Sequence, residues 1–313
     1  MPEWKIVLTD GLHEEGLPIL NAVAQVDDRD GIPAAELLGV IENYDAAIVR
    51  GRTKMTAEVF EAASRLKVIG RAGVGVDNID LAAATAHGVT VVNAPLATTL
   101  AVAEHTLALM LSVARSIPHA DEGLKSGQWL KNELEGVELM GKTLGVIGIG
   151  HIGRAVAQRA IALGMTVLAY DPVVPEDEIR GLGASPVHLL ELYERSDFLT
   201  LHVPLTLETR HMINGQALGH MKRGVRIICA SRGGIIDETA MLGALESGQV
   251  AGAGLDVFAK EPPGMSALVT HPNVVATPHI GAQTREAQAR TAVDIASEVL
   301  AALRGEALRW KIV

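Results

Sequence analysis

Three side chains that could do chemistry follow short apolar runs in the second half of the sequence. Arg232 comes after "VRIICAS", Glu261 after "AGAGLDVFAK" and His279 after "NVVATP". Taken singly, each is more often a surface arginine, a solvated loop glutamate or a turn histidine. Together, a cation, a carboxylate and an imidazole could hold an anionic substrate, polarise its carbonyl group and transfer a proton. Because all three follow successive strand-like runs, we favour the catalytic interpretation.

A glycine-rich stretch, "GVIGIGHIGRAVAQ", precedes these residues. Its glycines, Gly148, Gly150 and Gly153, have G-x-G-x-x-G spacing, and they stand between an apolar run and a helical pattern. This is the context in which the motif binds a dinucleotide. The first glycine permits the tight turn, the second lets the backbone approach a pyrophosphate, and the third allows close packing of helix on strand. The helix N-terminus supplies N–H donors and partial positive charge.

An acidic residue, Asp171, ends the next apolar run, "MTVLAYD", 18 residues after Gly153. A carboxylate at this position accepts hydrogen bonds from ribose hydroxyls and repels a 2′-phosphate, so it favours NAD over NADP. The alternative is that the glycines only make a turn and that Asp171 caps a helix. Strand, spacing and acid together favour the cofactor site.

Two series of strand-like runs must position these residues. The first contains "KIVLTD", "AAIVR", "KVIGR" and "VTVVNAP", which alternate with helical patterns at 12–21, 56–63 and 80–87. The second begins at residue 143 and contains "TLGVIGIG", "MTVLAYD", "DFLTLHVP", "VRIICASR", "AGAGLDVF" and "NVVATP". Strands that alternate with helices predict parallel sheets. The fold class is therefore α/β, with two doubly wound parallel-sheet domains.

Two long helical patterns, 99–117 and 284–305, connect the series. The first series lacks a closing helix, so we expect the C-terminal helix to return and pack on it. The predicted division is a flavodoxin-like substrate-binding domain, residues 1–97 plus 284–313, into which a Rossmann-type NAD-binding domain, residues 98–283, is inserted. Two connections between the domains would form a hinge, and closure would exclude water during the reaction.

Composition narrows the class of protein. Of the 313 residues, 48% are hydrophobic and only 3% aromatic, which suits strands of small aliphatic residues covered by helices. The net charge of −10 argues against nucleic acid or a membrane surface as partner. Cys229 is the only cysteine, which fits a reducing compartment, the cytoplasm. The N-terminus does not resemble a signal peptide, and residues 99–114 suit a buried helix better than a membrane span.

The whole chain resembles the D-2-hydroxyacid dehydrogenases, and within them most the D-3-phosphoglycerate dehydrogenases. The resemblance rests on "GRAGVGVDNIDL", "GIGHIGR", "YDP", "HVPLT", "ASRGGIIDE", "LDVFAKEPP" and "TPHIGAQTREAQ". It implies that His279 is the general acid/base at the substrate C2 oxygen, that Glu261 orients it and favours imidazolium, and that Arg232 holds the carboxylate. Hydride would pass between C2 and the nicotinamide.

The resemblance also implies binding residues. Cofactor contacts are expected at the glycine loop and Asp171, and also at His151, Ile152, Pro172, His202, Val203, Pro204, Ala230, Ser231, Asp256 and Gly281. Backbone N–H groups at Val74 and Gly75 would hold the substrate carboxylate. Arg50 and Arg71 are candidates for a substrate phosphate, with Arg52 and Lys54 beside them. The alternative is a solvated basic patch. No metal site is predicted.

Two features depart from the relatives. "PLATT" has Leu96, Ala97 and Thr98 where phosphoglycerate dehydrogenases usually carry an amide side chain, a change that could alter substrate choice. A serine-binding regulatory domain is not expected after Val313. The resemblance further implies a homodimer or homotetramer formed through residues 99–117 and 123–140, from which Lys131 would reach a neighbouring active site.

Three functions remain open on the sequence alone. The first is NAD-dependent oxidation of D-3-phosphoglycerate to 3-phosphohydroxypyruvate for serine biosynthesis. The second is reduction of glyoxylate, hydroxypyruvate, 2-oxoglutarate or another 2-keto acid on the same scaffold. The third is a non-catalytic NAD-sensing scaffold. The basic cluster favours the first, because an unphosphorylated acid does not need it.

Overall fold

The computed structural model describes residues 3–313, and the chain divides into two compact units. One unit is Met1–Thr98 together with Ala282–Val313, and the other is Thr99–Gly281. These limits lie close to those expected from the sequence.

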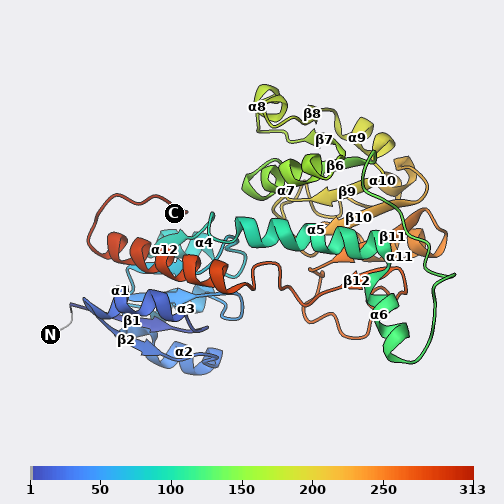
Figure 1. Ribbon diagram of the computed structural model, residues 1–313. Helices are drawn as coiled ribbons and strands as arrows, with labels where there is room; N and C mark the ends of the chain where they lie inside the picture. The colour runs from blue at the N-terminus through green and yellow to red at the C-terminus, as the bar shows by residue number, and fades with distance from the viewer. Residues whose placement is uncertain (1–2) are drawn as a thin grey trace. The chain divides into compact units, whose positions relative to one another are not determined.

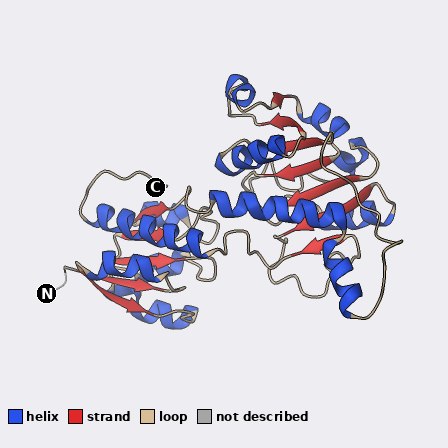
Figure 2. Ribbon diagram, in the orientation of Figure 1, coloured by secondary structure: helices blue, strands red, loops and turns tan. Residues whose placement is uncertain are grey.

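The first unit holds, within the described residues, a parallel sheet of five strands in the order β2-β1-β3-β4-β5. The strands are β1 (Trp4–Leu8), β2 (Ala24–Asp28), β3 (Ala46–Val49), β4 (Val68–Arg71) and β5 (Thr90–Asn93). The helices that alternate with them are α1 (Leu17–Asn21), α2 (Ala34–Val40), α3 (Ala57–Ala62) and α4 (Leu81–Ala86), with 3-10 turns at Glu14–Gly16 and Ile41–Asn43 (Figure 2). This is the flavodoxin-like strand order, in which the order reverses between β1 and β3.

The C-terminal helix α12 (Arg285–Leu303) packs on this first sheet, which confirms the expected return of the chain. The Thr284 hydroxyl caps its N-terminus by accepting the N–H of Ala287 at 3.1 Å. Ile295 and Val299 then face β4, where Gly70 provides the space for them. Figure 1 shows α12 lying along the strands of this unit. The residues after α12 pair with β5, with Lys311 opposite Val92.

The second unit holds, over the same described range, a parallel sheet of seven strands in the order β12-β11-β10-β9-β6-β7-β8. The strands are β6 (Thr143–Ile147), β7 (Thr166–Tyr170), β8 (Ser185–Pro186), β9 (Phe198–Leu201), β10 (Val225–Cys229), β11 (Val250–Leu255) and β12 (Val274–Ala276). The helices are α5 (Thr99–Arg115), α6 (Ile117–Lys125), α7 (His151–Ala162), α8 (Glu176–Gly181), α9 (Leu189–Arg195), α10 (Gly215–His220) and α11 (Glu238–Glu246). The order reverses between β6 and β9, as in a Rossmann fold.

The predicted fold class is confirmed, but two strands were missed. The segment Ala24–Asp28, "AQVDD", forms the edge strand β2, and its polar residues gave no apolar run. It is held by a continuous parallel register with β1, from Trp4 with Ala24 to Leu8 with Asp28. The second, β8, is only two residues long. Edge strands need to bury only part of their side chains, so hydrophobic pattern detects them poorly.

The predicted helix 99–117 is two helices. Helix α5 ends at Arg115, Ser116 adopts a left-handed φ of 51°, and Pro118 stands in the first turn of α6. A proline lacks the N–H that a continuous helix needs, and its ring opposes the preceding turn. Within residues 3–313 no single helix is both long and apolar enough to cross a membrane, although α5 and α6 taken together, bent by 64°, meet that criterion of length and composition.

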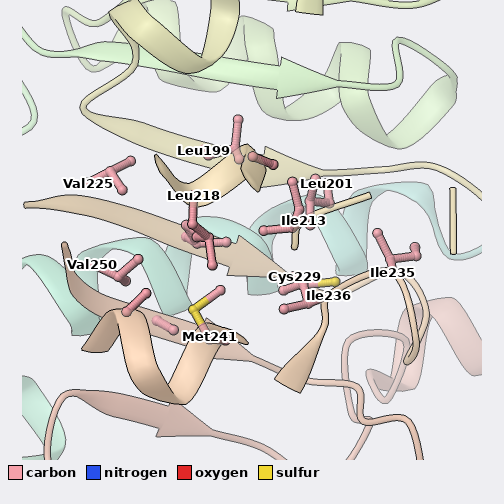
Figure 3. Close-up of a cluster of buried hydrophobic side chains, with 14 of the residues drawn as sticks. Leu199, Leu201, Ile213, Leu218, Val225, Cys229, Ile235, Ile236, Met241 and Val250 are labelled. Atoms are coloured by element: carbon pink, nitrogen blue, oxygen red, sulfur yellow. The ribbon is translucent and has the colours of Figure 1, made fainter. Parts of the chain in front are cut away.

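The core of the second unit forms between its sheet and the helices on one face. Leu199, Leu201 and Ile227 from central strands pack with residues of α10 and α11 such as Leu218 and Met241. Figure 3 shows Leu199, Leu201, Leu218 and Met241 in one cluster together with Cys229. The predicted small-aliphatic core is therefore observed, and it fixes the strand ends that carry the polar residues.

Candidate active site

His279 and Glu261 form a hydrogen-bonded pair beside the end of the second sheet. The Nδ1 atom of His279 lies 2.8 Å from Oε2 of Glu261. The other carboxylate oxygen of Glu261 accepts the N–H of Phe258 at 3.1 Å. Because Nδ1 carries the proton that faces Glu261, Nε2 is the ring nitrogen left to exchange a proton with a ligand. The side chains are 50% and 37% exposed, so a ligand can reach them.

The backbone at His279 is unusual. Its φ is 54°, in the left-handed region, three residues after the end of β12 and directly after Pro278. A histidine adopts this conformation only at some cost, and such residues concentrate at functional sites. The pairing with Glu261 predicted from the sequence is present, at a residue whose backbone has this uncommon conformation.

Asp256 holds the chain around His279. Its carboxylate is 1% exposed and accepts the N–H of Ile280 at 2.9 Å, the N–H of Gly281 at 2.8 Å and the hydroxyl of Thr277 at 2.5 Å. Burial raises the pKa of Asp256, but hydrogen bonds from His105, Thr277 and the two backbone N–H groups outweigh it and lower that pKa overall. Asp256 is therefore a buried carboxylate that acts on the loop; the cofactor contact expected of it stays a prediction.

Arg232 follows β10, the strand next to β11 in the sheet. Its Nη1 donates a hydrogen bond to the carbonyl of Ser231 at 2.7 Å. The next residue, Gly233, packs on the backbone of Phe258, where any side chain would collide with the carbonyl oxygen. Since β10, β11 and β12 are neighbours, the segments that carry Arg232, Glu261 and His279 leave the same edge of one sheet, as the sequence predicted.

The glycine loop lies between β6 and α7. Gly148 has a φ of 91°, and a Cβ there would come within 2.5 Å of the carbonyl oxygen of His202. A Cβ on Gly153 would overlap the carbonyl oxygen of Gly148. Gly150 differs, because it is the N-cap of α7 and no atom lies within 4 Å of where its Cβ would be. Two glycines therefore close the turn, and the third leaves open space at a helix N-terminus, which fits the pyrophosphate of a dinucleotide.

Asp171 is tied to this loop. One carboxylate oxygen accepts the N–H of Ile149 at 2.7 Å, and the other accepts the N–H groups of Val173 at 2.8 Å and Val174 at 3.1 Å. The carboxylate does not cap a helix, since the N-cap of α8 is Pro175. A carboxylate has about four acceptor positions, so capacity remains for a ribose hydroxyl.

His202 directly follows β9, across from the glycine loop. Burial lowers its pKa from 6.5 to about 4, so the imidazole is neutral at physiological pH. Its Nε2 lies 3.0 Å from the Thr200 hydroxyl, while Nδ1 is buried without a hydrogen-bond partner among the described residues. The backbone of His202 forms one wall beside Gly148. Burial also raises the pKa of the Cys229 thiol, which keeps that sulfur protonated.

The predicted phosphate residues lie in the first unit, after β3 and β4. The N–H of Arg50 is held by Asp10 at 2.6 Å, and its carbonyl accepts the amide of Asn78 at 2.9 Å. Its guanidinium donates to Gln283 at 3.3 Å, and burial lowers its pKa. Arg52, by contrast, is paired with Asp30 and lies 3.7 Å from Asp10. Arg50 thus remains a strong anion candidate, whereas Arg52 is already neutralised.

The loop that begins at Arg71 is held by an amide. The side chain of Asn93 donates to the carbonyl of Val74 at 2.7 Å, which orients the backbone of Val74 and Gly75. Gly73 has a φ of 149°. In the "PLATT" loop, residues 95–99, Thr98 is 4% exposed and Leu96 is 43% exposed. Thr98, which stands where an amide side chain was expected, is therefore buried. The side chain of Arg290 donates to the carbonyl of Ala97 at 3.1 Å.

Sequence reasoning missed the residues that hold these loops in place. They are Asp10, Asn78, Asn93, His105 and Thr277. Asp10 and Asn93 stand just after or at the ends of strands, a position that could have identified them. Within residues 3–313 no group of three or more His, Cys, Asp or Glu side chains is arranged to hold a metal ion.

Comparison with known proteins identifies the family. Residues 107–281 match the family model of the D-isomer specific 2-hydroxyacid dehydrogenase, NAD binding domain, which covers more than half of the chain. The chain belongs to the D-isomer specific 2-hydroxyacid dehydrogenase family. The cofactor of this family domain is NAD, and the matched range contains the glycine loop, Asp171 and all three residues of the predicted triad.

Individual relatives of this dehydrogenase cover nearly all of the chain. D-3-phosphoglycerate dehydrogenase of Synechocystis sp. is 48% identical over 301 residues, which are 96% of this chain and 54% of that protein. The crystal structure of TT0316 protein from Thermus thermophilus has a TM-score of 0.92 at 37% identity and covers 99% of this chain and 100% of that one. A glyoxylate reductase from Paecilomyes thermophila has a TM-score of 0.91 at 31% identity, over 100% of this chain and 99% of that one. This chain spans about half the length of the curated relatives it matches.

Proposed function

We propose that this dehydrogenase oxidises D-3-phosphoglycerate to 3-phosphohydroxypyruvate with NAD, a step of serine biosynthesis. The observation that carries the proposal is the His279–Glu261 pair, at an edge shared with Arg232 in a domain whose glycine loop fits a dinucleotide. The choice of substrate is supported by the similarity to D-3-phosphoglycerate dehydrogenases, at 48% identity.

The proton is handled by His279. In the direction of oxidation, neutral Nε2 takes the proton of the substrate hydroxyl at C2, and in reduction the imidazolium returns it. Glu261 fixes the tautomer through Nδ1 at 2.8 Å and stabilises the positive charge that the ring acquires. Arg232 binds the substrate carboxylate and stabilises negative charge on the C2 oxygen. When bound, NAD would supply the acceptor for the hydride that leaves C2.

We assign NAD to the carboxyl edge of the second sheet, along the glycine loop that follows β6. The backbone of Gly150, His151 and Ile152 at the N-terminus of α7 would bind the pyrophosphate, and Asp171 the adenosine ribose. The remaining assigned contacts are Pro172, His202, Val203, Pro204, Ala230, Ser231, Asp256 and Gly281. The buried, unpaired Nδ1 of His202 at this edge supports a polar ligand there.

The first unit would supply recognition of the substrate's anionic groups. We assign the phosphate to Arg50 and Arg71 and the carboxylate to the N–H groups of Val74 and Gly75. Asp10 and Asn78 hold Arg50 through its backbone, and its guanidinium donates to the side chain of Gln283 at 3.3 Å, a contact that a bound anion would replace. Burial that lowers the pKa of Arg50 also makes binding of an anion more favourable, because the charge is poorly solvated.

A second candidate is reduction of an unphosphorylated 2-keto acid. It is favoured by the neutralisation of Arg52 by Asp30 and Asp10, by the inward-turned Thr98 and by the close structural match to a glyoxylate reductase. A non-catalytic NAD-binding scaffold would use neither proton transfer nor a phosphate site.

One panel of assays separates the three functions. NADH formation is measured with 3-phosphoglycerate, D-glycerate, D-lactate and D-2-hydroxyglutarate, and NADH consumption with 3-phosphohydroxypyruvate, hydroxypyruvate and glyoxylate. We expect the highest kcat/KM for the phosphorylated pair, and Arg50→Gln to reduce it while D-glycerate turnover stays the same. Preference for an unphosphorylated acid supports the second candidate, and no turnover with NADH still bound supports the scaffold.

We also propose that this dehydrogenase is a dimer in the cytoplasm. Leu111, Ile117, Leu124, Trp129 and Met140 expose 43%, 53%, 63%, 79% and 74% of their area on α5, α6 and the following loop. A concentration of large exposed apolar side chains typically marks an interface. Trp129→Asp with Leu124→Asp should convert a dimer to a monomer in sedimentation equilibrium, and Leu207→Asp, at an equally exposed site elsewhere, should not.

A further inference from the structure

His105 is a polar residue on α5 that the proposed mechanism does not use. Its side chain is 17% exposed and points at the site from the helix packed on β10, β11 and β12. The Nε2 atom lies 3.3 Å from a carboxylate oxygen of Asp256 and 3.1 Å from the hydroxyl of Thr277. His105 therefore contacts both residues that hold the chain on either side of His279.

One carboxylate, that of Asp256, holds the chain from Thr277 to Gly281 by hydrogen bonds. Asp256 accepts the Thr277 hydroxyl, before the histidine, and the N–H groups of Ile280 and Gly281, after it. Between them His279 has a φ of 54°, a conformation that costs of order 1–3 kcal/mol unless its surroundings impose it. Asp256 thus sets the orientation of the His279 ring, because its hydrogen bonds fix the backbone on both sides of this strained residue.

Asp256 in turn needs a hydrogen-bond donor from outside the segment 277–281. A carboxylate that is 1% exposed is stable only when hydrogen-bonded on several sides. Thr277, Ile280 and Gly281 all belong to the segment being held, so they move with it. His105 belongs to α5, which is anchored in the core through residues such as Leu109 and Met110. The backbone of Asp256 follows β11 and donates to the carbonyl of Cys229 at 2.9 Å, and His105 adds a contact from α5 to the carboxylate itself.

We propose that His105 is a positioning residue, which aims His279 through Asp256 and Thr277. The proposal rests on the proposed function, because it assumes that His279 moves the proton. Misplacing a catalytic group by about 1 Å costs about 10²-fold in rate. Loss of the Nε2 contact should therefore reduce kcat by about 10- to 100-fold. NADH affinity should fall less, because the polar contacts of His105 are to Asp256 and Thr277, whereas the pyrophosphate and the adenosine ribose are assigned to the glycine loop and Asp171.

Three variants test this. His105→Leu removes the donor at similar volume, and His105→Gln keeps an N–H donor near the position of Nε2. Thr106→Val is the matched control: it alters the next residue of α5, fully buried, whose hydroxyl bonds only to the carbonyl of Val102 at 2.8 Å. For each we measure kcat, KM, the solvent deuterium isotope effect on kcat, NADH affinity by fluorescence, and hydrogen exchange of the peptide spanning residues 275–284.

We expect His105→Leu to lower kcat, to raise the solvent isotope effect and to speed exchange at Ile280 and Gly281, with a smaller loss of NADH affinity than of kcat. His105→Gln should recover most of the turnover, and Thr106→Val should behave like the natural protein. The proposal is overturned if His105→Leu matches Thr106→Val in both kcat and exchange, or if exchange rises without loss of kcat. If the natural protein itself turns over no acid, the proposed function fails. Hydrogen exchange still tests the further inference separately, because unchanged exchange in His105→Leu would refute the claim that His105 holds residues 277–281 in place.

Discussion

The two glycines Gly150 and Gly153 allow the cofactor site to be tested apart from the fold. They stand three residues apart at the start of α7, yet their surroundings are opposite. No atom lies within 4 Å of a Cβ placed on Gly150, whereas one on Gly153 would meet the carbonyl oxygen of Gly148 closer than 3.0 Å. Alanine at the first position should fill only ligand space, and alanine at the second should disturb the loop itself.

The magnitudes follow from these contacts. Gly150 has a φ of −70°, which any residue adopts, so Gly150→Ala should change the free energy of unfolding by less than about 1 kcal/mol. Its methyl group would occupy the place where the pyrophosphate meets the helix N-terminus. Loss of one charge-assisted hydrogen bond, about 1.5–3 kcal/mol, weakens NADH binding by about 10- to 100-fold. Gly153→Ala should cost about 1–3 kcal/mol in stability or more, because backbone must move.

The assay pairs thermal unfolding without cofactor with NADH titration by fluorescence. Gly150→Ala should unfold at nearly the natural temperature and bind NADH weakly, while Gly153→Ala should unfold several degrees lower. Ala155→Gly on the same helix controls for changes in helix propensity. Normal NADH affinity in Gly150→Ala would show that the pyrophosphate does not lie at this helix end, and the site as described would be wrong.

Three other changes probe the surrounding residues. Glu261→Gln keeps an acceptor for Phe258 but removes the charge that faces His279, so kcat should fall by about 10-fold or more with NADH affinity unchanged; equal turnover would remove the carboxylate from the mechanism. Asp171→Ala should raise the NADP-to-NAD ratio of kcat/KM, and a constant ratio would exclude the ribose contact. Burial lowers the pKa of His202 to about 4 in the folded chain, from about 6.5 in the unfolded chain. As the pH falls from about 6.5 to 4, the unfolded chain binds the proton first, so the free energy of unfolding should fall by up to about 3 kcal/mol. His202→Asn, followed by denaturant unfolding without cofactor, should flatten that dependence, and an unaltered pH slope would mean that the imidazole titrates normally.

Much of the fold and of the polar site was predictable because the signals are local. Strands such as β6 and β10 are dense in Val, Ile and Leu, and the glycine spacing fixes a turn between strand and helix. Arg232, Glu261 and His279 each follow such a strand, so their shared edge followed from parallel topology. The pairing of Glu261 with His279 was expected from family resemblance and is confirmed by the 2.8 Å contact.

The residues that hold the loops were not predictable because their partners are distant in sequence. Asp256 accepts N–H groups from 24 and 25 residues away, and Asp10 accepts that of Arg50 from 40 residues away. No local pattern encodes such contacts. The neutralisation of Arg52 by Asp30 was also invisible, so the basic cluster seemed stronger in the sequence than it is in the folded unit.

In the proposed mechanism, His279 transfers the proton while hydride leaves or enters C2. The most direct measurement is single-turnover oxidation of NADH by 3-phosphohydroxypyruvate, followed by the loss of NADH absorbance, with the natural protein and with His279→Ala, both preloaded with NADH. Loss of the general acid should slow the hydride step by about 10²- to 10⁴-fold while the NADH dissociation constant stays nearly the same. A variant that oxidises NADH at the natural rate would contradict the account.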